Sequence, residues 1–243
     1  MQNTGFENET NIKEYLHGKY FYELNHNLKN NLILKLSNDI DNETIISCCK
    51  IGGANKADLG IKINKKAYLI SVKKGTGNSL HQEPIRTFID YIKKIEGCDE
   101  EIINSVKYYI WGDNTYDGTG PIADRMNAIY LKKYHPEILT KIQKFFDLNK
   151  KILIDRFIKY GTKRESEYAQ FIYYGTVSNG IIRPIDNVVE YLSKITKPIL
   201  SVGGLTFQAW NRNINGGNKS EKKRGVIQLK WGNINKELSN VPE

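Results

Sequence analysis

The sequence contains little cysteine and no long apolar run. Its three cysteines, Cys48, Cys49 and Cys98, are odd in number and lack a CxxC spacing, which argues against a disulfide framework and a cysteine zinc site. No stretch reaches the roughly 18 apolar residues of a membrane-spanning helix, and the polar start MQNTGFENETN does not have the pattern of a signal peptide. We therefore expect a cytoplasmic protein with reduced cysteines and no contact with a membrane.

Internal repeats, long low-complexity linkers and a nucleotide-binding loop are also missing. The glycines of GTGN at 75–78 are not followed by the Gly-Lys-Ser/Thr ending of a phosphate-binding loop, so ATP binding is not expected. With 243 residues, 40% of them hydrophobic, the chain is long enough to bury one substantial core. We predict a single domain over residues 1–243.

Acidic residues are fewer than basic ones. The 36 Lys and Arg residues against 27 Asp and Glu give a net charge of +9 and an isoelectric point near 9.2. This balance suits a protein that approaches a polyphosphate such as nucleic acid. Because a lysine-rich composition also accompanies AT-rich genomes, the charge alone does not decide the function.

The apolar spacing indicates a mixture of helices and strands. Helices are predicted within 9–36, with a break near Gly18, from Pro84 to about Gly97, and over most of 124–160 with a boundary at His135-Pro136. Strands are predicted at 43–52, 58–63, 67–73, 106–112, within 199–210, and at 225–231. This order predicts an α/β (α+β) fold with a C-terminal β-hairpin element over 198–234.

Two of these strands form a predicted hairpin whose register follows from its apolar positions. Side chains alternate between the two faces of a strand, so the apolar sets of 58–63 and 67–73 must face the same core. A turn at 64–65 achieves this when Ile61 pairs with Tyr68 and Leu59 with Ile70. The opposite face of the hairpin is then left to polar residues.

Three polar residues converge on that face. The register sets Asp58 across from Ser71, and Lys73 lies diagonally from Asp58 within reach of a long side chain. A carboxylate can hold a divalent cation, while a lysine can orient water and offset negative charge, as phosphodiester hydrolysis requires. Mg²⁺ takes one or two acidic ligands, and Glu83, before Pro84 at the mouth of the next helix, is the candidate for the second.

At these positions the sequence resembles the PD-(D/E)xK nuclease superfamily. The usual pattern is an Asp that begins one hairpin strand and an acid-x-Lys on the next. Asp58 and Lys73 match it, while Ala57 replaces the Pro and Ser71 replaces the acid. In one branch of type II restriction endonucleases the second motif is Ser-x-Lys and a Glu of the following helix supplies the carboxylate. Ser-Val-Lys followed by Glu83 looks like this arrangement, with a somewhat shorter gap.

The resemblance covers about residues 44–95, the predicted catalytic core, and implies a restriction-endonuclease-like central mixed sheet flanked by helices. It implies Mg²⁺ held by Asp58 and Glu83, a Lys73 that positions the attacking water, and a Ser71 that contacts the ligands rather than the metal. It also implies a homodimer that cuts double-stranded DNA at a specific, palindromic sequence. A companion DNA methyltransferase would act on the same sequence without stable binding.

A further acid is expected from the N-terminal part of the chain. Members of the superfamily often carry a Glu on the helix before the first strand of the core. Glu23 lies close to the apolar stripe of residues 21–36, and we prefer it to Glu14 for this role.

Contact with DNA is predicted for the segment 205–233. Amide and Arg side chains suit base edges, and a Lys cluster suits phosphates. The candidates are Gln208, Asn211, Arg212, Asn213, Lys219, Lys222, Lys223, Arg224, Gln228 and Lys230. The plainer interpretation of the segment is a basic hairpin loop kept soluble by its charges.

Two other functions agree with the same residues. A structure-specific nuclease of DNA repair or recombination shares the catalytic core but recognises the shape of DNA. In a non-catalytic DNA-binding module, Asp58 only begins a strand, Lys73 is a solvated edge residue, and Glu83 complements a helix N-terminus.

Overall fold

The computed structural model describes residues 4–53, 55–76, 78–120, 125–162, 168–198, 200–210 and 223–243. The chain forms two compact units. The first unit comprises Met1–Asn78, Ile158–Tyr191 and Gly232–Glu243, and the second comprises Ser79–Phe157 and Leu192–Trp231. The predicted core segment 44–95 therefore contributes to both units, whereas most of the predicted C-terminal β element belongs to the second.

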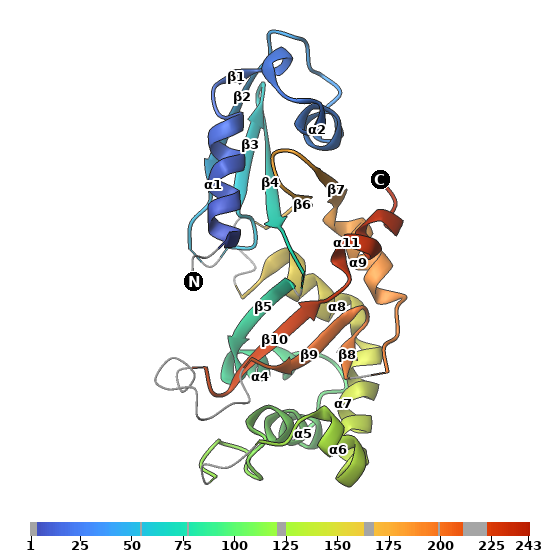
Figure 1. Ribbon diagram of the computed structural model, residues 1–243. Helices are drawn as coiled ribbons and strands as arrows, with labels where there is room; N and C mark the ends of the chain where they lie inside the picture. Colours follow the sequence, from blue (N-terminus) through green and yellow to red (C-terminus); the bar gives the residue numbers. More distant parts are fainter. Residues whose placement is uncertain are drawn as a thin grey trace. The chain divides into compact units, whose positions relative to one another are not determined.

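A six-stranded mixed sheet forms the centre of the first unit (Figure 1). Its strands are β1 (Lys19–Tyr20), β2 (Ile45–Lys50), β3 (Leu59–Ile63), β4 (Lys66–Lys73), β6 (Phe171–Gly175) and β7 (Gly180–Pro184), in the order β1-β2-β3-β4-β6-β7. Strands β4 and β6 run parallel, and the other neighbours are antiparallel. The predicted central mixed sheet is therefore confirmed.

Helices of the N-terminal part cover one face of this sheet. They are α1 (Thr4–Leu16), the 3₁₀ turn η1 (Phe21–Glu23), and a helical segment made of α2 (His26–Leu28), the π-turn η2 (Lys29–Ile33) and α3 (Leu34–Leu36). Ile12 and Leu16 of α1 share a buried apolar cluster with Leu28 and Leu32 and with β2, β3 and β4. The predicted break falls between α1 and α2, where Gly18 has a φ of +80°. The unit is completed by α11 (Ile234–Glu237), the 3₁₀ turn η4 (Leu238–Asn240) and most of α9 (Ile185–Ser193).

The hairpin of β3 and β4 has the predicted register. Ile61 pairs with Tyr68 and Leu59 with Ile70, and all four side chains are buried. Each such apolar side chain contributes about 1.5–3 kcal/mol of transfer free energy when it leaves water. A slip of one residue would expose this whole set, so burial fixes which residues stand on the opposite face.

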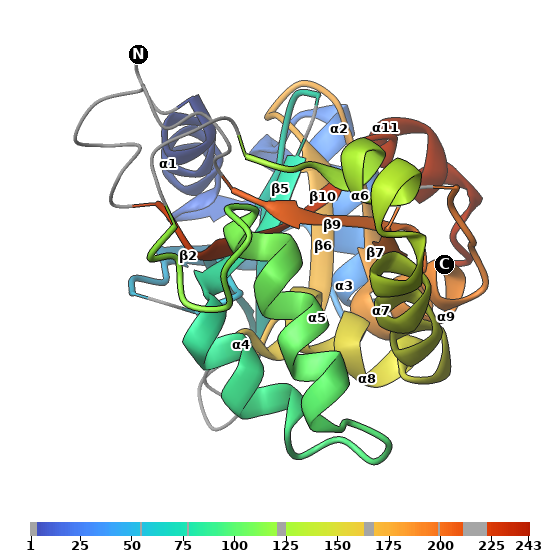
Figure 2. The same ribbon diagram turned by 90° about the horizontal axis from the view of Figure 1, so that it is seen from below.

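The second unit has its own four-stranded sheet, with strand order β5-β10-β9-β8. The strands are β5 (Asn78–Pro84), β8 (Ser201–Val202), β9 (Leu205–Ala209) and β10 (Val226–Trp231), and the helices are α4 (Ile85–Ile92), α5 (Glu100–Trp111), α6 (Ala128–Tyr134), α7 (Pro136–Leu148) and α8 (Lys150–Asp155). Figure 2 shows α5 beside both α4 and α7. Phe207 of β9 contacts the rings of Phe88, Tyr109 and Phe146 and so joins the sheet to these helices. A π-turn η3 (Arg156–Tyr160) lies where the chain leaves this unit.

The strand predicted at 106–112 is wrong, because residues 106–111 belong to helix α5 and Gly112 ends that helix. The β-branched and aromatic residues of VKYYIW favour a strand locally. The buried positions 102, 103, 106, 109 and 110 instead follow the helical period. Asp99 caps the helix by accepting a hydrogen bond from the backbone N–H of Ile102, and Gly112, with a φ of +62°, ends it.

The other helices and strands agree only in part with the sequence-based predictions. No element was predicted for residues 78–84, which form strand β5, and strands β6 and β7 and helix α9 were not predicted either. Helix α4 and the boundary at His135-Pro136 are confirmed, as are the strands at 225–231 and within 199–210. The three cysteines are free. In the described part of the chain, no helix has the length and apolar character needed to cross a membrane.

Candidate active site

Asp58 stands where the ladder between β3 and β4 opens. Its backbone N–H still donates to the carbonyl of Ile70 at 2.9 Å. Two residues further along β4, the N–H of Val72 donates instead to Oδ2 of the Asp58 side chain at 2.6 Å. The carboxylate therefore takes the place of a ladder acceptor, which holds it firmly at the end of the hairpin.

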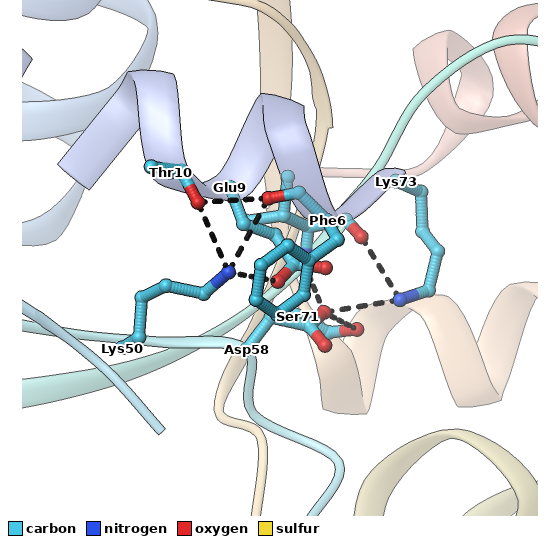
Figure 3. A network of polar contacts seen from close by, with 8 residues as sticks. Phe6, Glu9, Thr10, Lys50, Asp58, Ser71 and Lys73 are labelled. Carbon is cyan, nitrogen blue, oxygen red and sulfur yellow. Dashed lines mark hydrogen bonds and ion pairs between the residues drawn. The ribbon is translucent and has the colours of Figure 1, made fainter. Parts of the chain in front are cut away.

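The predicted trio meets on this carboxylate (Figure 3). Ser71 Oγ and Lys73 Nζ each donate to Oδ2 of Asp58 at 3.1 Å, and Lys73 Nζ also donates to the carbonyl of Val72 at 2.9 Å. Ser71 is buried, whereas the side chains of Asp58 and Lys73 keep 23% and 20% of their surface exposed. Among the described residues, Oδ1 of Asp58 takes part in no hydrogen bond. The cluster is thus ordered and still accessible to a ligand.

A second acid, Glu9 of helix α1, belongs to a group of polar contacts at the same end of the sheet as Asp58. Glu9 Oε2 pairs with Lys50 Nζ at 3.1 Å, and Lys50 also donates to Thr10 Oγ1 and to the carbonyl of Phe6. Lys50 stands opposite Leu59, the residue that follows Asp58, so this group belongs to the same end of the sheet. Figure 3 draws the two groups together. We missed Glu9, although its spacing of three and seven residues from the buried Ile12 and Leu16 places it on the sheet-facing side of α1.

Glu23 lies at the other end of the sheet. It ends η1, directly after β1, whose Tyr20 pairs with Ile45. Its Oε2 accepts a hydrogen bond from the backbone N–H of Tyr20 at 2.8 Å, and its side chain is exposed. Because β2 and β3 are antiparallel, this end of β2 lies beside the end of β3 that is remote from Asp58. The structure does not bring Glu23 to the Asp58 cluster, and its contacts are those of a helix cap.

Glu83 occupies a closed ionic cluster in the second unit. It lies on β5, and its carboxylate contacts His81 Nε2 at 2.9 Å and Arg156 Nε at 3.0 Å, with a further bond from Arg156 Nη2. The guanidinium of Arg156 also stacks 4.0 Å from the ring centroid of Tyr91. The side chain of Glu83 has no exposed surface.

Burial alone would raise the pKa of Glu83, since it disfavours the charged carboxylate. The hydrogen bonds from His81 and Arg156, together with the charge of Arg156, outweigh burial and hold this pKa below its ordinary value of 4.5. Glu83 is therefore an anion whose two oxygens already have partners. Its role as a metal ligand stays a prediction that these contacts do not favour.

The described DNA-contact candidates, from Gln208 to Lys230, lie in the second unit. Gln208 Nε2 donates to Gln228 Oε1, and Gln228 Nε2 donates to Ser79 Oγ, each at 3.0 Å, so the two amides form a chain across β9, β10 and β5. Lys230, which pairs with Thr206, stands on the same face and is partly exposed.

The base of the loop between β9 and β10 carries two further candidates. Lys223 Nζ lies 5.3 Å from the ring centroid of Trp210, and Arg224 bonds to the carbonyl of Gly118 and pairs with Asp113 at 3.5 Å. The remaining candidates of the segment lie outside the described residues, namely Asn211, Arg212, Asn213, Lys219 and Lys222.

Comparison with known proteins identifies the fold. A solved structure of the restriction endonuclease MspI in complex with its cognate DNA is similar to this chain with a TM-score of 0.51 and 16% sequence identity. The match covers 81% of this chain and 74% of the other. No family model matches the sequence, and no curated protein is significantly similar to it. The chain therefore has a mixed α+β fold of the restriction-endonuclease type, and at this identity the likeness establishes the fold alone.

Proposed function

We propose that this protein is a Mg²⁺-dependent endonuclease that hydrolyses phosphodiester bonds of double-stranded DNA at a specific sequence, as type II restriction endonucleases do. The observation that carries the proposal is the cluster of Asp58, Ser71 and Lys73 at the open end of a hairpin within this fold. A charged carboxylate, a hydroxyl and an ammonium group meet at a place that a phosphate can approach.

The donor set fits Mg²⁺. Among the described residues no group of three or more His, Cys, Asp and Glu side chains gathers in one place, but Mg²⁺ needs only one or two carboxylates, with water and substrate oxygens completing its shell. Asp58 supplies one carboxylate through Oδ1, and Glu9 is our choice for the second. Bound there, the ion would polarise the phosphate and acidify a water molecule.

The remaining residues of the cluster would orient the attacking water and the Asp58 carboxylate and offset the charge on the phosphate. Lys73 Nζ donates to Asp58 Oδ2 and to the Val72 carbonyl. From there it would position the attacking water and offset the negative charge that develops on the phosphate. Ser71 and the Val72 N–H fix the carboxylate of Asp58 through its Oδ2, so that among the described residues its Oδ1 is left for a ligand. Removal of Lys73 should therefore reduce catalysis more than folding.

DNA contact is assigned to strands β9 and β10 and the loop between them. In the major groove, Gln amides match adenine, and Lys side chains meet the flanking phosphates. Gln208 uses one N–H for Gln228, which leaves it one N–H and its oxygen for a base edge. Lys223 and Lys230 are the described phosphate candidates, and the loop residues named above remain predictions.

The resemblance to type II enzymes extends the proposal to partners. A palindromic target requires one active site for each strand, which a homodimer supplies. A DNA methyltransferase that modifies the same sequence would protect the host genome without binding this protein.

Incubation of plasmid DNA with the protein and Mg²⁺ tests the proposal. Discrete fragments that disappear when EDTA removes the metal are the expected result. Cuts limited to branched or damaged DNA would favour a repair nuclease, and a gel shift without cleavage would favour a binding module. Lys62→Ala is the matched control for Lys73→Ala, because Lys62 is an exposed lysine of the same hairpin.

A further inference from the structure

Helix α7 presents an exposed ridge in the second unit. Pro136, Thr140, Lys144 and Leu148 recur every four residues and therefore form one row along the helix, and all four are exposed. Leu148 has 77% of its surface exposed and borders the apolar lining of both grooves. The same four residues border two grooves, one on each side of the ridge.

The groove between α7 and α5 has an apolar floor and an acidic wall. Ile102 and Phe145 line its floor, and its volume is about 930 Å³. Four acids line it against two lysines: Glu96, Asp99, Glu101 and Glu137 against Lys141 and Lys144. In a chain with a net charge of +9, this is a local excess of negative charge.

The groove on the other side of the ridge carries the opposite charge. It has a volume of about 700 Å³, and Leu139, Pro198 and Leu200 supply its apolar surface. Three lysines line it against one acid: Lys132, Lys144 and Lys197 against Asp147. The ridge therefore separates an acidic groove from a basic one.

Each groove is bounded by α7 on one side and by an outer wall on the other. The two outer walls contact α7 at nearly the same position along the helix axis. Glu101 of the acidic wall pairs with Lys141, and Ser201, next to the basic wall, exchanges two hydrogen bonds of 3.0 Å with the side chain of Gln143. Lys141 and Gln143 are only two residues apart on the helix. A two-fold rotation about an axis parallel to α7 leaves the position along the helix unchanged. It places the acidic side of one copy opposite the basic side of the other.

We propose that this surface binds a second copy of the chain, with the two α7 helices parallel to a two-fold axis. With this axis, the acidic groove of one copy faces the basic wall of the other. The two-fold symmetry repeats this contact, so it forms twice in the dimer. The same axis also places the ridge of each copy in the basic groove of its partner. A two-fold axis perpendicular to α7 would instead set acid against acid, so charge selects the parallel arrangement.

A second copy fits better than a partner of one charge. An acidic or a basic partner would leave one of the two grooves facing charge of its own sign, whereas the surface complements itself. The inference stands on the second unit alone and does not depend on DNA cleavage. Failure of the nuclease proposal would leave it unchanged.

Sedimentation velocity over a range of protein concentrations tests it with one matched pair of variants. Leu148→Arg should weaken the dimer at least tenfold, because a charge would enter the apolar groove of the partner. Ile129→Arg is the control, since Ile129 is equally exposed, at 79%, on α6 and lines neither groove. It should leave the dimer unchanged. Circular dichroism confirms that each variant is folded.

A charge swap sharpens the test. Lys197→Glu and Glu96→Lys should each weaken the dimer several-fold at low salt, and the double variant should recover most of the loss because the two walls face each other across the axis. A wild-type chain that stays monomeric at all concentrations would overturn the proposal. So would a dimer that Leu148→Arg does not affect, or single charge variants whose losses simply add in the double variant.

Discussion

Two carboxylate–cation clusters of this protein are built from the same kinds of side chain and differ in access. Asp58 and Lys73 pair at 3.1 Å with about a fifth of each side chain exposed. Glu83 and Arg156 form a two-point contact in which the side chains are 0% and 7% exposed. An exposed pair can exchange partners for a metal or a phosphate at little cost, whereas a buried pair that loses one partner leaves a stranded charge. The first cluster suits catalysis, and the second suits the stability of its unit.

The largest expected effect is on cleavage by Lys73→Ala. Loss of the ammonium group should lower the single-turnover cleavage rate by about 10²- to 10⁴-fold, because the group positions water and stabilises developing charge. Quenched-flow measurement on a plasmid checks it. The Lys62→Ala control should cleave at the wild-type rate, and equal losses in both variants would mean that general charge, not this cluster, drives the reaction.

Substitutions in the buried cluster of Glu83 and Arg156 should lower the free energy of unfolding. Arg156→Met leaves the Glu83 carboxylate buried without its main partner and should lower the free energy of unfolding by about 3–5 kcal/mol. Urea denaturation measures this loss. The double variant with Glu83→Leu should lose clearly less than the two single losses added together, because it removes the stranded charge as well. A small loss for Arg156→Met alone would show that the cluster is open to water.

Glu9→Gln tests the second metal ligand that we assign. A neutral amide binds Mg²⁺ more weakly than a carboxylate, so the Mg²⁺ concentration for half-maximal cleavage should rise about tenfold. The matched control is Glu14→Gln, an exposed glutamate on the same helix. A Mg²⁺ requirement that does not change in Glu9→Gln would remove Glu9 from the site.

The pH dependence of stability gives the smallest effect. Because the folded state holds the pKa of Glu83 below its ordinary value of 4.5, this residue stabilises the fold above that pH. The contribution is lost as the pH falls from 4.5 toward the lowered folded pKa. Unfolding free energies measured across this range should fall more steeply for the wild type than for Glu83→Gln. Parallel profiles would contradict the closed ion cluster.

The hairpin that carries the site was predictable because its pattern is local. Alternation of apolar residues set the register of Leu59 with Ile70, and that register brought Asp58, Ser71 and Lys73 together. Burial enforces such a pattern from a few neighbouring residues. Helix α5 was missed for the related reason that strand-favouring residues obscured its helical period over too short a window.

The other acids were not predictable in the same way, since their partners are distant in sequence. Arg156, which binds Glu83, lies 73 residues away from it. Lys50, the partner of Glu9, belongs to strand β2, whereas Glu9 belongs to helix α1. The spacing after the strand showed that Glu83 was close to the hairpin in sequence and could not show that another side chain already neutralised it.

The most direct test of the difference between the accessible Asp58 cluster and the buried Glu83 cluster compares DNA cleavage by Asp58→Asn and by Glu83→Gln. Each cleavage rate is corrected for the folded fraction of the variant. We predict that Asp58→Asn loses cleavage at any Mg²⁺ concentration, while folded Glu83→Gln cuts within a few-fold of the wild-type rate. An active Asp58→Asn, or a Glu83→Gln that is folded and inactive, would contradict this prediction.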